Sequence, residues 1–488
     1  MTRFRAWRLA AVIVAAGLAA AGCTVNPATG KEEFTPFMTP AQEIEVGRKE
    51  HPKLLAAFGG AYEERPALSR YVAGIGERIK RATETPDTPF TFTVVNSDIV
   101  NAFALPGGYV YVSRGLLALA NSEAELAGVI AHETGHVTGR HTAKRYSRGV
   151  LAQLGAAIAG VATGNRMIGQ LANLGAAAYV QGYSRSQELE ADTLGVGYLA
   201  RAGYDPEAMA SFLEVLGAES ALARKIAGRE GADPAASLFS SHPRTARRVV
   251  EAARAARGRG NGHPFIGHDA YLLHLDGTLY GDDPDQGIRR GREFIHPGLR
   301  FRFEVPPGFR MQNTSKAVLA SHRNGAAIRF DGARAVAGLS MTEYLTGLWL
   351  KDVPLRQVEA LTVNGMAAAT GTARANTRQG QRDVRAIVIR YDRTHLYRFL
   401  VITPPQITAS MSEDLRRMTY SFRALSEAEA RAVKPLRIRI HEVAAGETVD
   451  SLAARLPFDD FRVERFRVLN GLKPNEALRP GRLVKLIE

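Results

Sequence analysis

Residues 122–136 read SEAELAGVIAHETGH, and they predict a helix that begins at Ser122 and carries two histidines. Ser122 and Glu125 have the spacing of a capping box, and the apolar residues that follow recur at helical spacing. His132 and His136 are four residues apart, so a helix places both imidazoles on one face, one turn apart. The stretch therefore presents two candidate metal ligands on a single helix.

Zinc suits this pattern of residues. Two neutral imidazole nitrogens can bind one zinc ion at about 2.0–2.1 Å. Glu133 lies beside the same face and can take a proton from a water molecule whose pKa zinc lowers from about 15.7 to about 7. A nucleophile made in this way, next to a polarised carbonyl, performs peptide hydrolysis. The alternative is a helix that exposes its His and Glu side chains to solvent.

A hydrolytic zinc site needs a third protein ligand and one open position. Glu188 and Asp192 are four residues apart in the segment ELEAD and share a helix face. One of them can bind the metal while the other holds a ligating imidazole by its second nitrogen, whereas Glu190 points elsewhere. The alternative for this segment is an acidic helix surface, and only the pairing with His132 and His136 argues against it.

The surrounding segments predict helices and a small sheet. Residues 41–83 carry apolar side chains at helical spacing, and another helix begins near Ser184 and ends at Gly203. Strands are expected at residues 90–95, 101–105 and 109–112. A Pro-Gly-Gly turn joins the last two into a hairpin. Residues 150–180 form two apolar pieces, too short to span a bilayer, which we expect to be helices that are buried or lie along a membrane face.

Several motifs together resemble metallopeptidase family 48, in particular its beta-barrel assembly-enhancing protease members. The motifs are NAFALPGG at 101–108, HETGH at 132–136, SR at 184–185, ELEAD at 188–192 and AGYDP at 202–206. NPATG at 26–30 is also similar to the start of the exported members. The resemblance covers roughly residues 25–250. It implies an α+β fold with a mainly helical, gluzincin-type zinc protease domain that contains a small antiparallel sheet.

The resemblance also implies roles for individual residues. Glu188 would be the third zinc ligand, and Asp192 would support a ligating imidazole. An extended substrate would pair by backbone hydrogen bonds with the edge strand that contains Asn101, Ala102, Phe103 and Ala104. His242 matches a family histidine near the metal, where it would either stabilise the oxyanion of the tetrahedral intermediate or cap the zinc ion.

The amino terminus predicts export. Three arginines precede an apolar run at residues 9–21, which is shorter than the roughly 20 residues of a membrane-spanning helix. The residues up to Cys23 resemble a bacterial lipobox, so we expect Cys23 to be acylated and to become the first mature residue. Thr24 favours the outer membrane over the inner one. The alternative is an ordinary cleavable signal.

Composition divides the chain into segments, with a cluster of Arg and Gly at residues 251–263 near the end of the first domain. The predicted organisation is a lipoprotein-type signal peptide at 1–22, a zinc protease domain at 23–255, a linker at 256–289, an α+β domain of unassigned role at 290–425 and a LysM-like domain at 436–488. LysM modules have a βααβ order and bind N-acetylglucosamine polymers, which implies peptidoglycan as a partner. The alternative for this last segment is a small packing domain that binds no sugar.

The formal net charge of +14 does not by itself choose among nucleic acid, an anionic membrane and an anionic wall polymer. The arginine-rich stretch at 244–259 has no interleaved aromatic residues and the chain is predicted to be exported, so nucleic acid is not an expected partner. We expect a periplasmic, lipid-anchored metalloendopeptidase with one zinc ion per chain that cleaves unfolded or misassembled envelope proteins. The competing class is a chaperone or scaffold that binds such proteins and peptidoglycan, with proteolysis secondary.

Overall fold

The computed structural model describes most of the chain. The described residues are 23–35, 38–148, 183–226, 228, 264–314, 316–377 and 380–488. The predicted signal at 1–22, the apolar pieces at 150–180 and His242 lie outside these ranges. In the part of the chain that is described, no helix is both long enough and apolar enough to cross a membrane.

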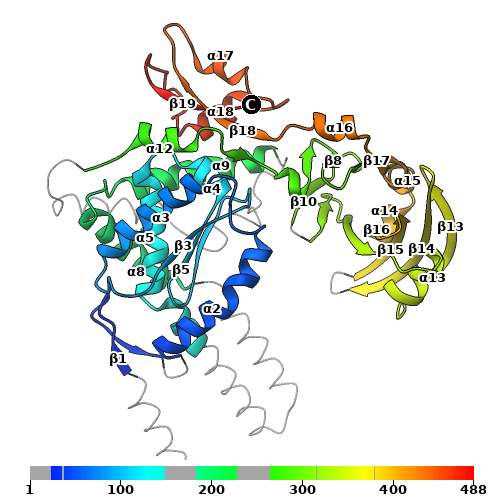
Figure 1. The fold of residues 1–488 in the computed structure, drawn as a ribbon, viewed down its shortest axis with the longest axis horizontal. Helices are drawn as coiled ribbons and strands as arrows, with labels where there is room; N and C mark the ends of the chain where they lie inside the picture. Colours follow the sequence, from blue (N-terminus) through cyan, green and yellow to red (C-terminus); the bar gives the residue numbers. More distant parts are fainter. Residues whose placement is uncertain are drawn as a thin grey trace, which may run out of the picture. The chain divides into compact units, whose positions relative to one another are not determined.

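The chain divides into two compact units (Figure 1). The first unit comprises Met1–Leu55, Gly60–Tyr280 and Arg437–Glu488, and the second comprises Ala56–Gly59 and Gly281–Leu436. The C-terminal segment, predicted as a separate domain, therefore belongs to the same compact unit as the predicted metal ligands. The chain returns to the first unit after it has completed the second.

The first unit contains a three-stranded sheet of mixed direction. Its strands are β3 (Thr91–Val95), β4 (Ala102–Leu105) and β5 (Tyr109–Ser113), in the order β3-β5-β4. The predicted hairpin of β4 and β5 is confirmed, but β5 pairs with β3 in parallel, so the expectation of a wholly antiparallel sheet is wrong. The chain reverses after β3 and again after β4, and β5 inserts between them and runs parallel to β3. Within this sheet, β4 is an edge strand.

Helices of the first unit pack against this sheet and against one another, and Figure 1 shows α3 and α5 beside the sheet. These helices are α2 (Pro40–Ala57), α3 (Pro66–Arg81), α4 (Arg114–Leu119), α5 (Glu123–Thr138), α8 (Arg185–Arg201), α9 (Ala208–Ile226) and α12 (His268–Leu275). The predicted helical region 41–83 is two helices, because Gly59 and Gly60 have positive φ and Pro66 begins a new helix. α5 is buried along nearly its whole length and contacts α3, α8 and α9.

The helices that carry the predicted site begin at their predicted caps. At α5, the Ser122 hydroxyl accepts a hydrogen bond from the Glu125 backbone N–H (3.1 Å). The Glu125 carboxylate accepts from the Asn121 N–H (2.7 Å) rather than from that of Ser122, so only half of the predicted capping box forms. At α8, Ser184 and Gln187 make both hydrogen bonds of the capping box.

Residues 268–280, which the sequence assigns to a linker, are part of the first unit. They form α12 and β6 (Leu279–Tyr280), and Tyr271 and Leu275 are fully buried. These residues belong to the first unit because burial of their apolar side chains stabilises that unit. The neighbouring Arg- and Gly-rich stretch led to their assignment to a linker. β6 then joins a three-stranded sheet with two strands from the C-terminal segment, in the order β19-β18-β6.

The C-terminal segment has the order strand, helix, helix, strand. Its elements are β18 (Leu436–Glu442), α17 (Val449–Ala453), α18 (Arg462–Leu469) and β19 (Leu483–Ile487). At the other end of the described chain, β1 (Cys23–Val25) and β2 (Glu32–Phe34) form an antiparallel hairpin. Both chain ends thus contribute small sheets to the first unit.

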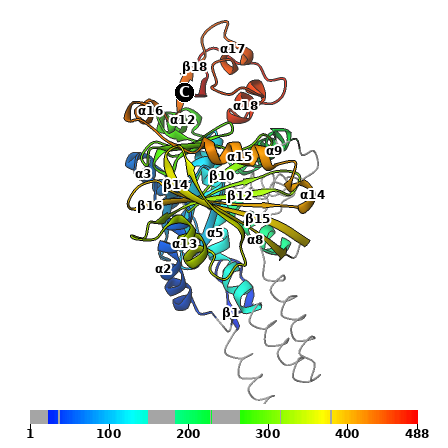
Figure 2. The same cartoon turned by 90° about the vertical axis from the view of Figure 1, so that its right-hand side faces the viewer.

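The second unit is built on a seven-stranded antiparallel sheet, part of which faces the viewer in Figure 2. In sheet order its strands are β10 (Arg310–Asn313), β11 (Val318–Ser321), β12 (Ala327–Arg334), β16 (His395–Thr403), β15 (Gly380–Arg390), β14 (Met366–Thr377) and β13 (Arg356–Val363). A second sheet has the order β17 (Arg423–Ala424), β9 (Phe301–Glu304), β8 (Glu293–His296) and β7 (Ile288–Arg290). The helical segments are η2 (Pro284–Gln286), α13 (Met341–Tyr344), η3 (Leu345–Trp349), α14 (Pro405–Thr408), α15 (Ser412–Ser421) and α16 (Glu427–Ala432). The core contains a cluster of aromatic side chains: Phe294, Phe301, Phe303, Phe330, Phe399 and Phe422. The mixture of helices and several sheets confirms the α+β class.

A buried lysine attaches the C-terminal segment to the remainder of the first unit. Lys485 of β19 is 0% exposed, and its Nζ donates hydrogen bonds to the carbonyl oxygens of Ala118 (2.7 Å) and Ala120 (2.8 Å), where α4 ends. Burial lowers the pKa of Lys485 from 10.5 to about 7, although the nearby Glu125 carboxylate acts to raise it. Since α5 begins at Glu123, the C-terminal segment holds the chain directly before the metal-bearing helix.

The lowered pKa of Lys485 predicts a pH-dependent stability. Between about pH 7 and pH 10 the unfolded chain binds the proton on this amine and the folded chain does not, so the free energy of unfolding rises with pH, by at most about 1.4 kcal/mol per pH unit. Below pH 7 both states hold the proton and the contribution is constant. We expect Lys485→Met to lose this component of the rise in urea unfolding measured across that range, while Lys473→Met, at an exposed lysine of the same segment, keeps it. Equal pH slopes in the parent and Lys485→Met would contradict the assignment.

Candidate metal centre

Two glycines allow α5 and α8 to pack closely enough to share a site. A Cβ on Gly135 of α5 would lie 2.9 Å from the carbonyl oxygen of Ala191 on α8. A Cβ on Gly195 of α8 would lie 3.1 Å from the backbone nitrogen of His132. Side chains at these two positions would push the helices apart, so glycine is needed for the close approach. The approach brings the carboxylates of α8 up to the histidines of α5.

Three buried side chains converge at the contact between these helices. The Nε2 atoms of His132 and His136 are 2.9 Å apart. Glu188 places one carboxylate oxygen 3.6 Å from His132 Nε2 and the other 3.5 Å from His136 Nε2. All three residues are at most 2% exposed. Tetrahedral zinc with bonds of about 2.0–2.1 Å has ligand atoms about 3.3 Å apart, so this donor set fits zinc.

The second nitrogen of His132 faces a carboxylate of α8. Its Nδ1 lies 2.9 Å from the Oδ1 of Asp192, which is one turn after Glu188 on α8. A carboxylate this close to Nδ1 favours the tautomer with the proton on Nδ1 and the lone pair on Nε2, the atom that faces Glu188 and His136. Asp192 therefore lies where it fixes the tautomer that a metal ligand needs.

The second nitrogen of His136 has a partner that the sequence reasoning missed. His136 Nδ1 lies 2.8 Å from the Nδ1 of His141, and the Nε2 of His141 lies 3.0 Å from the Oε2 of Glu190. Glu190 was expected to point away from the site, and it instead reaches it through this intervening imidazole. Hydrogen bonding from His141, and then from Lys31, holds the pKa of Glu190 well below its usual value. Burial lowers the pKa of His141.

The position of His141 explains why it was missed. α5 ends at Thr138, and Arg140 has a φ of +50°, so helical periodicity cannot place the residues beyond it. A third histidine five residues after His136 was nevertheless a visible signal in the sequence HETGHVTGRH. His141 is fully buried, as expected for a residue that belongs to the site rather than to the surface.

Glu133, the predicted general base, is 1% exposed and lies on α5 between the two histidine ligands in sequence. Its neighbours on the helix, His132 and Thr134, are also buried. A carboxylate at this position is held close to the metal ligands by the helix backbone and is kept from bulk water. The arrangement combines a zinc-binding donor set with an acid–base group, which is what hydrolysis requires.

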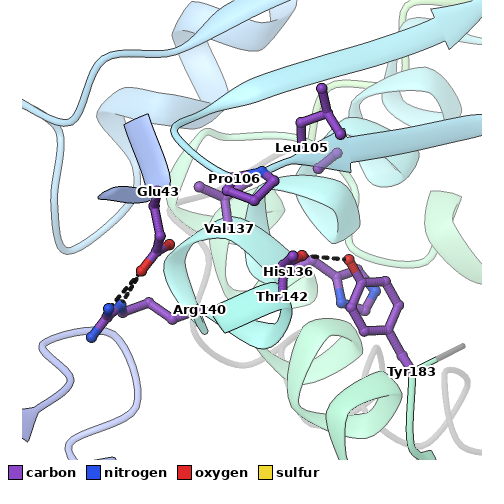
Figure 3. Close-up of a pocket in the computed structure, with 9 residues that line it drawn as sticks. Glu43, Leu105, Pro106, His136, Val137, Arg140, Thr142 and Tyr183 are labelled. Carbon is purple, nitrogen blue, oxygen red and sulfur yellow. Dashed lines mark hydrogen bonds and ion pairs between the residues drawn. The ribbon is translucent and has the colours of Figure 1, made fainter. Parts of the chain in front are cut away.

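A small pocket opens beside His136 (Figure 3). One wall is the end of β4 and the turn after it, with Leu105 and Pro106. The Tyr183 ring stacks on the His136 imidazole, with centroids 4.0 Å apart, and its hydroxyl is 3.1 Å from that of Thr142. The predicted substrate edge strand therefore ends next to a metal ligand.

The remaining predicted residues are placed as follows. Ala102, Phe103 and Ala104 lie on the edge strand β4, and Asn101 precedes it, with its carbonyl accepting a hydrogen bond from the Ser113 N–H (3.0 Å). His242 lies outside the described residues, so its role stays a prediction. Cys23 begins β1.

Comparisons with known proteins agree with this geometry. Residues 66–256 match a family model described as "Peptidase family M48". The chain is 37% identical over 202 residues to the "Putative beta-barrel assembly-enhancing protease" of Vibrio cholerae, covering 39% of this chain and 40% of that protein. It is 32% identical over 222 residues to the "Beta-barrel assembly-enhancing protease" of Yersinia pestis, covering 43% of each. It is also 37% identical over 163 residues to the "Mitochondrial metalloendopeptidase OMA1" of Arabidopsis thaliana, covering 33% of this chain and 30% of that protein.

The chain thus spans less than half of the length of each of these three relatives. The matched region includes α5 and α8, and it therefore contains the three converging ligands and Glu133. Taken together, the match and the donor geometry show that residues 66–256 carry a zinc metalloendopeptidase domain similar to peptidase family M48.

Proposed function

We propose that this protein is a metalloendopeptidase of the bacterial cell envelope that cleaves misfolded or stalled envelope proteins. The observation that carries the proposal is the convergence of His132, His136 and Glu188 within zinc-binding distance, with Glu133 on the same helix. Two of the bacterial relatives bear names that refer to beta-barrel assembly. Transmembrane beta-barrels of bacteria lie in the outer membrane, which supports an envelope substrate class.

His132, His136 and Glu188 would hold the zinc ion, and Asp192 would orient the His132 imidazole. A bound zinc ion supplies Lewis acidity, which lowers the pKa of water and polarises the scissile carbonyl. Glu133 takes a proton from the attacking water as its oxygen bonds to the carbonyl carbon. As the C–N bond breaks, Glu133 returns that proton to the departing amine. His242 is proposed to stabilise the oxyanion or to cap the metal.

An extended substrate is proposed to add to the sheet along β4. In an antiparallel pair, hydrogen-bonded residue pairs alternate with pairs whose backbone groups face away. Asn101 bonds to Ser113, so the pair of Phe103 and Tyr111 is also hydrogen-bonded. The N–H and C=O of Ala104, which is partly exposed, are then directed away from β5. Backbone pairing of this kind recognises an extended chain of almost any sequence, which suits unfolded substrates.

The competing function is a chaperone or scaffold that binds unfolded envelope proteins along the same edge. Such a protein has no use for a buried carboxylate beside a metal-binding donor set. Burial of the Glu133 carboxylate lowers the stability of the fold. Hydrolysis needs this carboxylate as a base, whereas substrate binding does not. We therefore favour the peptidase.

For the C-terminal segment we propose a packing role in the first unit, because Lys485 is buried against α4 and Gly471 lies against Asn121 and Val215. Binding of peptidoglycan is the competing role, which rests on the LysM resemblance. We also propose that an acylated Cys23 attaches the protein to the outer membrane. The peptidase would then lie on the periplasmic side of that membrane.

Glu133→Gln tests the catalytic assignment. The amide keeps the size of the side chain but cannot take a proton, so we expect cleavage of a casein-like unfolded substrate to fall by at least about 100-fold while the zinc content is unchanged. Glu214→Gln, on the exposed side of α9, is the matched control and should cleave like the parent. Cleavage by Glu133→Gln at the parental rate would show that the mechanism is wrong.

Ala104→Pro tests the proposed substrate strand. Proline removes the N–H that is directed away from β5 and leaves the hairpin bonds of the neighbouring residues, a change that edge strands tolerate. Loss of one substrate hydrogen bond of about 1 kcal/mol predicts roughly a five-fold lower kcat/KM on an extended peptide. Ala104→Ser retains the N–H and should cleave like the parent, with circular dichroism confirming that both variants fold. Unchanged kcat/KM in Ala104→Pro would place the substrate elsewhere.

Cys23→Ser tests the proposed anchor. The parent should incorporate labelled palmitate in bacteria and sediment with membranes, because the acyl chain adds about 0.8 kcal/mol of membrane affinity per buried CH₂. The variant should lose the label and appear in the soluble periplasmic fraction. A parent that carries no label would favour the ordinary cleavable signal.

A further inference from the structure

The two zinc-ligand histidines are supported in different ways. His132 Nδ1 contacts a carboxylate directly, at 2.9 Å from Asp192. His136 Nδ1 contacts another imidazole, His141, at 2.8 Å, and that imidazole contacts the Glu190 carboxylate at 3.0 Å. A carboxylate thus supports the second ligand as well, but through an intervening imidazole.

The chemistry of the three groups sets the direction of the hydrogen bonds. A carboxylate can only accept, so His141 donates from Nε2–H to Glu190. A neutral His141 then has its lone pair on Nδ1, where it accepts from His136 Nδ1–H. His136 in turn has its lone pair on Nε2, the atom that faces His132 and Glu188. The chain of bonds therefore selects the His136 tautomer that can bind a metal ion.

Lysines from two segments hold the far end of this chain. Lys31 Nζ lies 2.7 Å from Glu190 Oε1, and Lys144 Nζ lies 3.2 Å from Glu190 Oε2. Lys144 also pairs with Glu33 of β2 at 2.7 Å. Lys31 and Glu33 both belong to the N-terminal hairpin region, so that region contacts the support of a metal ligand.

A further contact fixes the hairpin against the metal-bearing helix. The Asn26 side-chain amide donates to Glu33 (2.7 Å) and to the carbonyl oxygen of Thr138, the last residue of α5. The second of these bonds has a length of 2.8 Å, and Asn26 is 2% exposed. The hairpin is therefore docked on the end of the helix that carries His136, rather than forming a loose tether.

We propose that His141 and Glu190 are positioning residues for the zinc ligand His136, and that the N-terminal hairpin locks them in place through Lys31. This inference rests on the proposed function in that it takes His136 as a zinc ligand. It predicts that zinc affinity depends on residues that do not touch the metal, as partners of ligating imidazoles commonly affect affinity by about 10- to 100-fold.

The test measures zinc affinity by competition with a chromophoric chelator in the full chain. We expect His141→Leu to lose about 10- to 100-fold in affinity, and His141→Gln, whose amide oxygen can accept from His136 Nδ1–H, to recover most of it. If His141 only filled space, the apolar Leu would be tolerated at least as well as Gln. Glu190→Gln should also lower the affinity, and Lys31→Met should lower it by a smaller factor.

Two matched variants serve as controls. Glu214→Gln and Lys53→Met remove exposed charges away from the site and should bind zinc like the parent. Circular dichroism measures whether each metal-free variant is folded. If His141→Leu is unfolded, Glu190→Gln carries the test, because the Glu190 side chain is partly exposed, at 16%. In the Co²⁺-loaded protein, the ligand-field absorption bands should shift in Glu190→Gln and not in the controls.

Zinc affinities of His141→Leu and Glu190→Gln within two-fold of the parent, with unshifted cobalt bands, would overturn the inference. If the parent binds zinc and the variants show the expected losses, but the parent cleaves no peptide, the proposed function would be overturned. The positioning role of His141 and Glu190 would then still hold. A parent that binds no zinc would overturn both.

Discussion

The close contact between α5 and α8 is the constraint on which the rest of the site depends. Gly135 and Gly195 remove the side chains that would otherwise separate the helices, and Glu188 can then approach His132 and His136. Neither helix could form a zinc site alone, because α5 supplies two ligands and α8 the third. The other helices of the first unit that contact α5, among them α3 and α9, hold it in place for this contact.

Both ends of the described chain are fastened near this contact. The C-terminal segment caps the end of α4 through Lys485, just before α5 begins. The N-terminal hairpin reaches the end of α5 through Asn26 and reaches α8 through Lys31. The N-terminal hairpin and the C-terminal segment, which the sequence predicts to be a separate domain, therefore both contact the ends of elements that hold the metal-bearing helices. The second unit completes its own aromatic core independently.

Features with strong local signals could be predicted from the sequence. The caps at Ser122 and Ser184, the β4–β5 hairpin and the spacing of His132 and His136 depend on residues close together in the chain. Features that depend on distant contacts could not. The parallel pairing of β3, the docking of Lys485 and the approach of Glu190 to His141 arise only when segments far apart in sequence pack together.

Metal analysis of the purified chain tests the proposed zinc site directly. We predict about one zinc ion per chain in the parent and loss of that zinc in Glu188→Ala, because two imidazoles alone leave the donor set incomplete. Glu214→Ala, which removes an exposed carboxylate of α9 away from the site, should keep zinc. Zinc retained at the parental level by Glu188→Ala, or absent from the parent, would contradict the assignment of His132, His136 and Glu188 as zinc ligands.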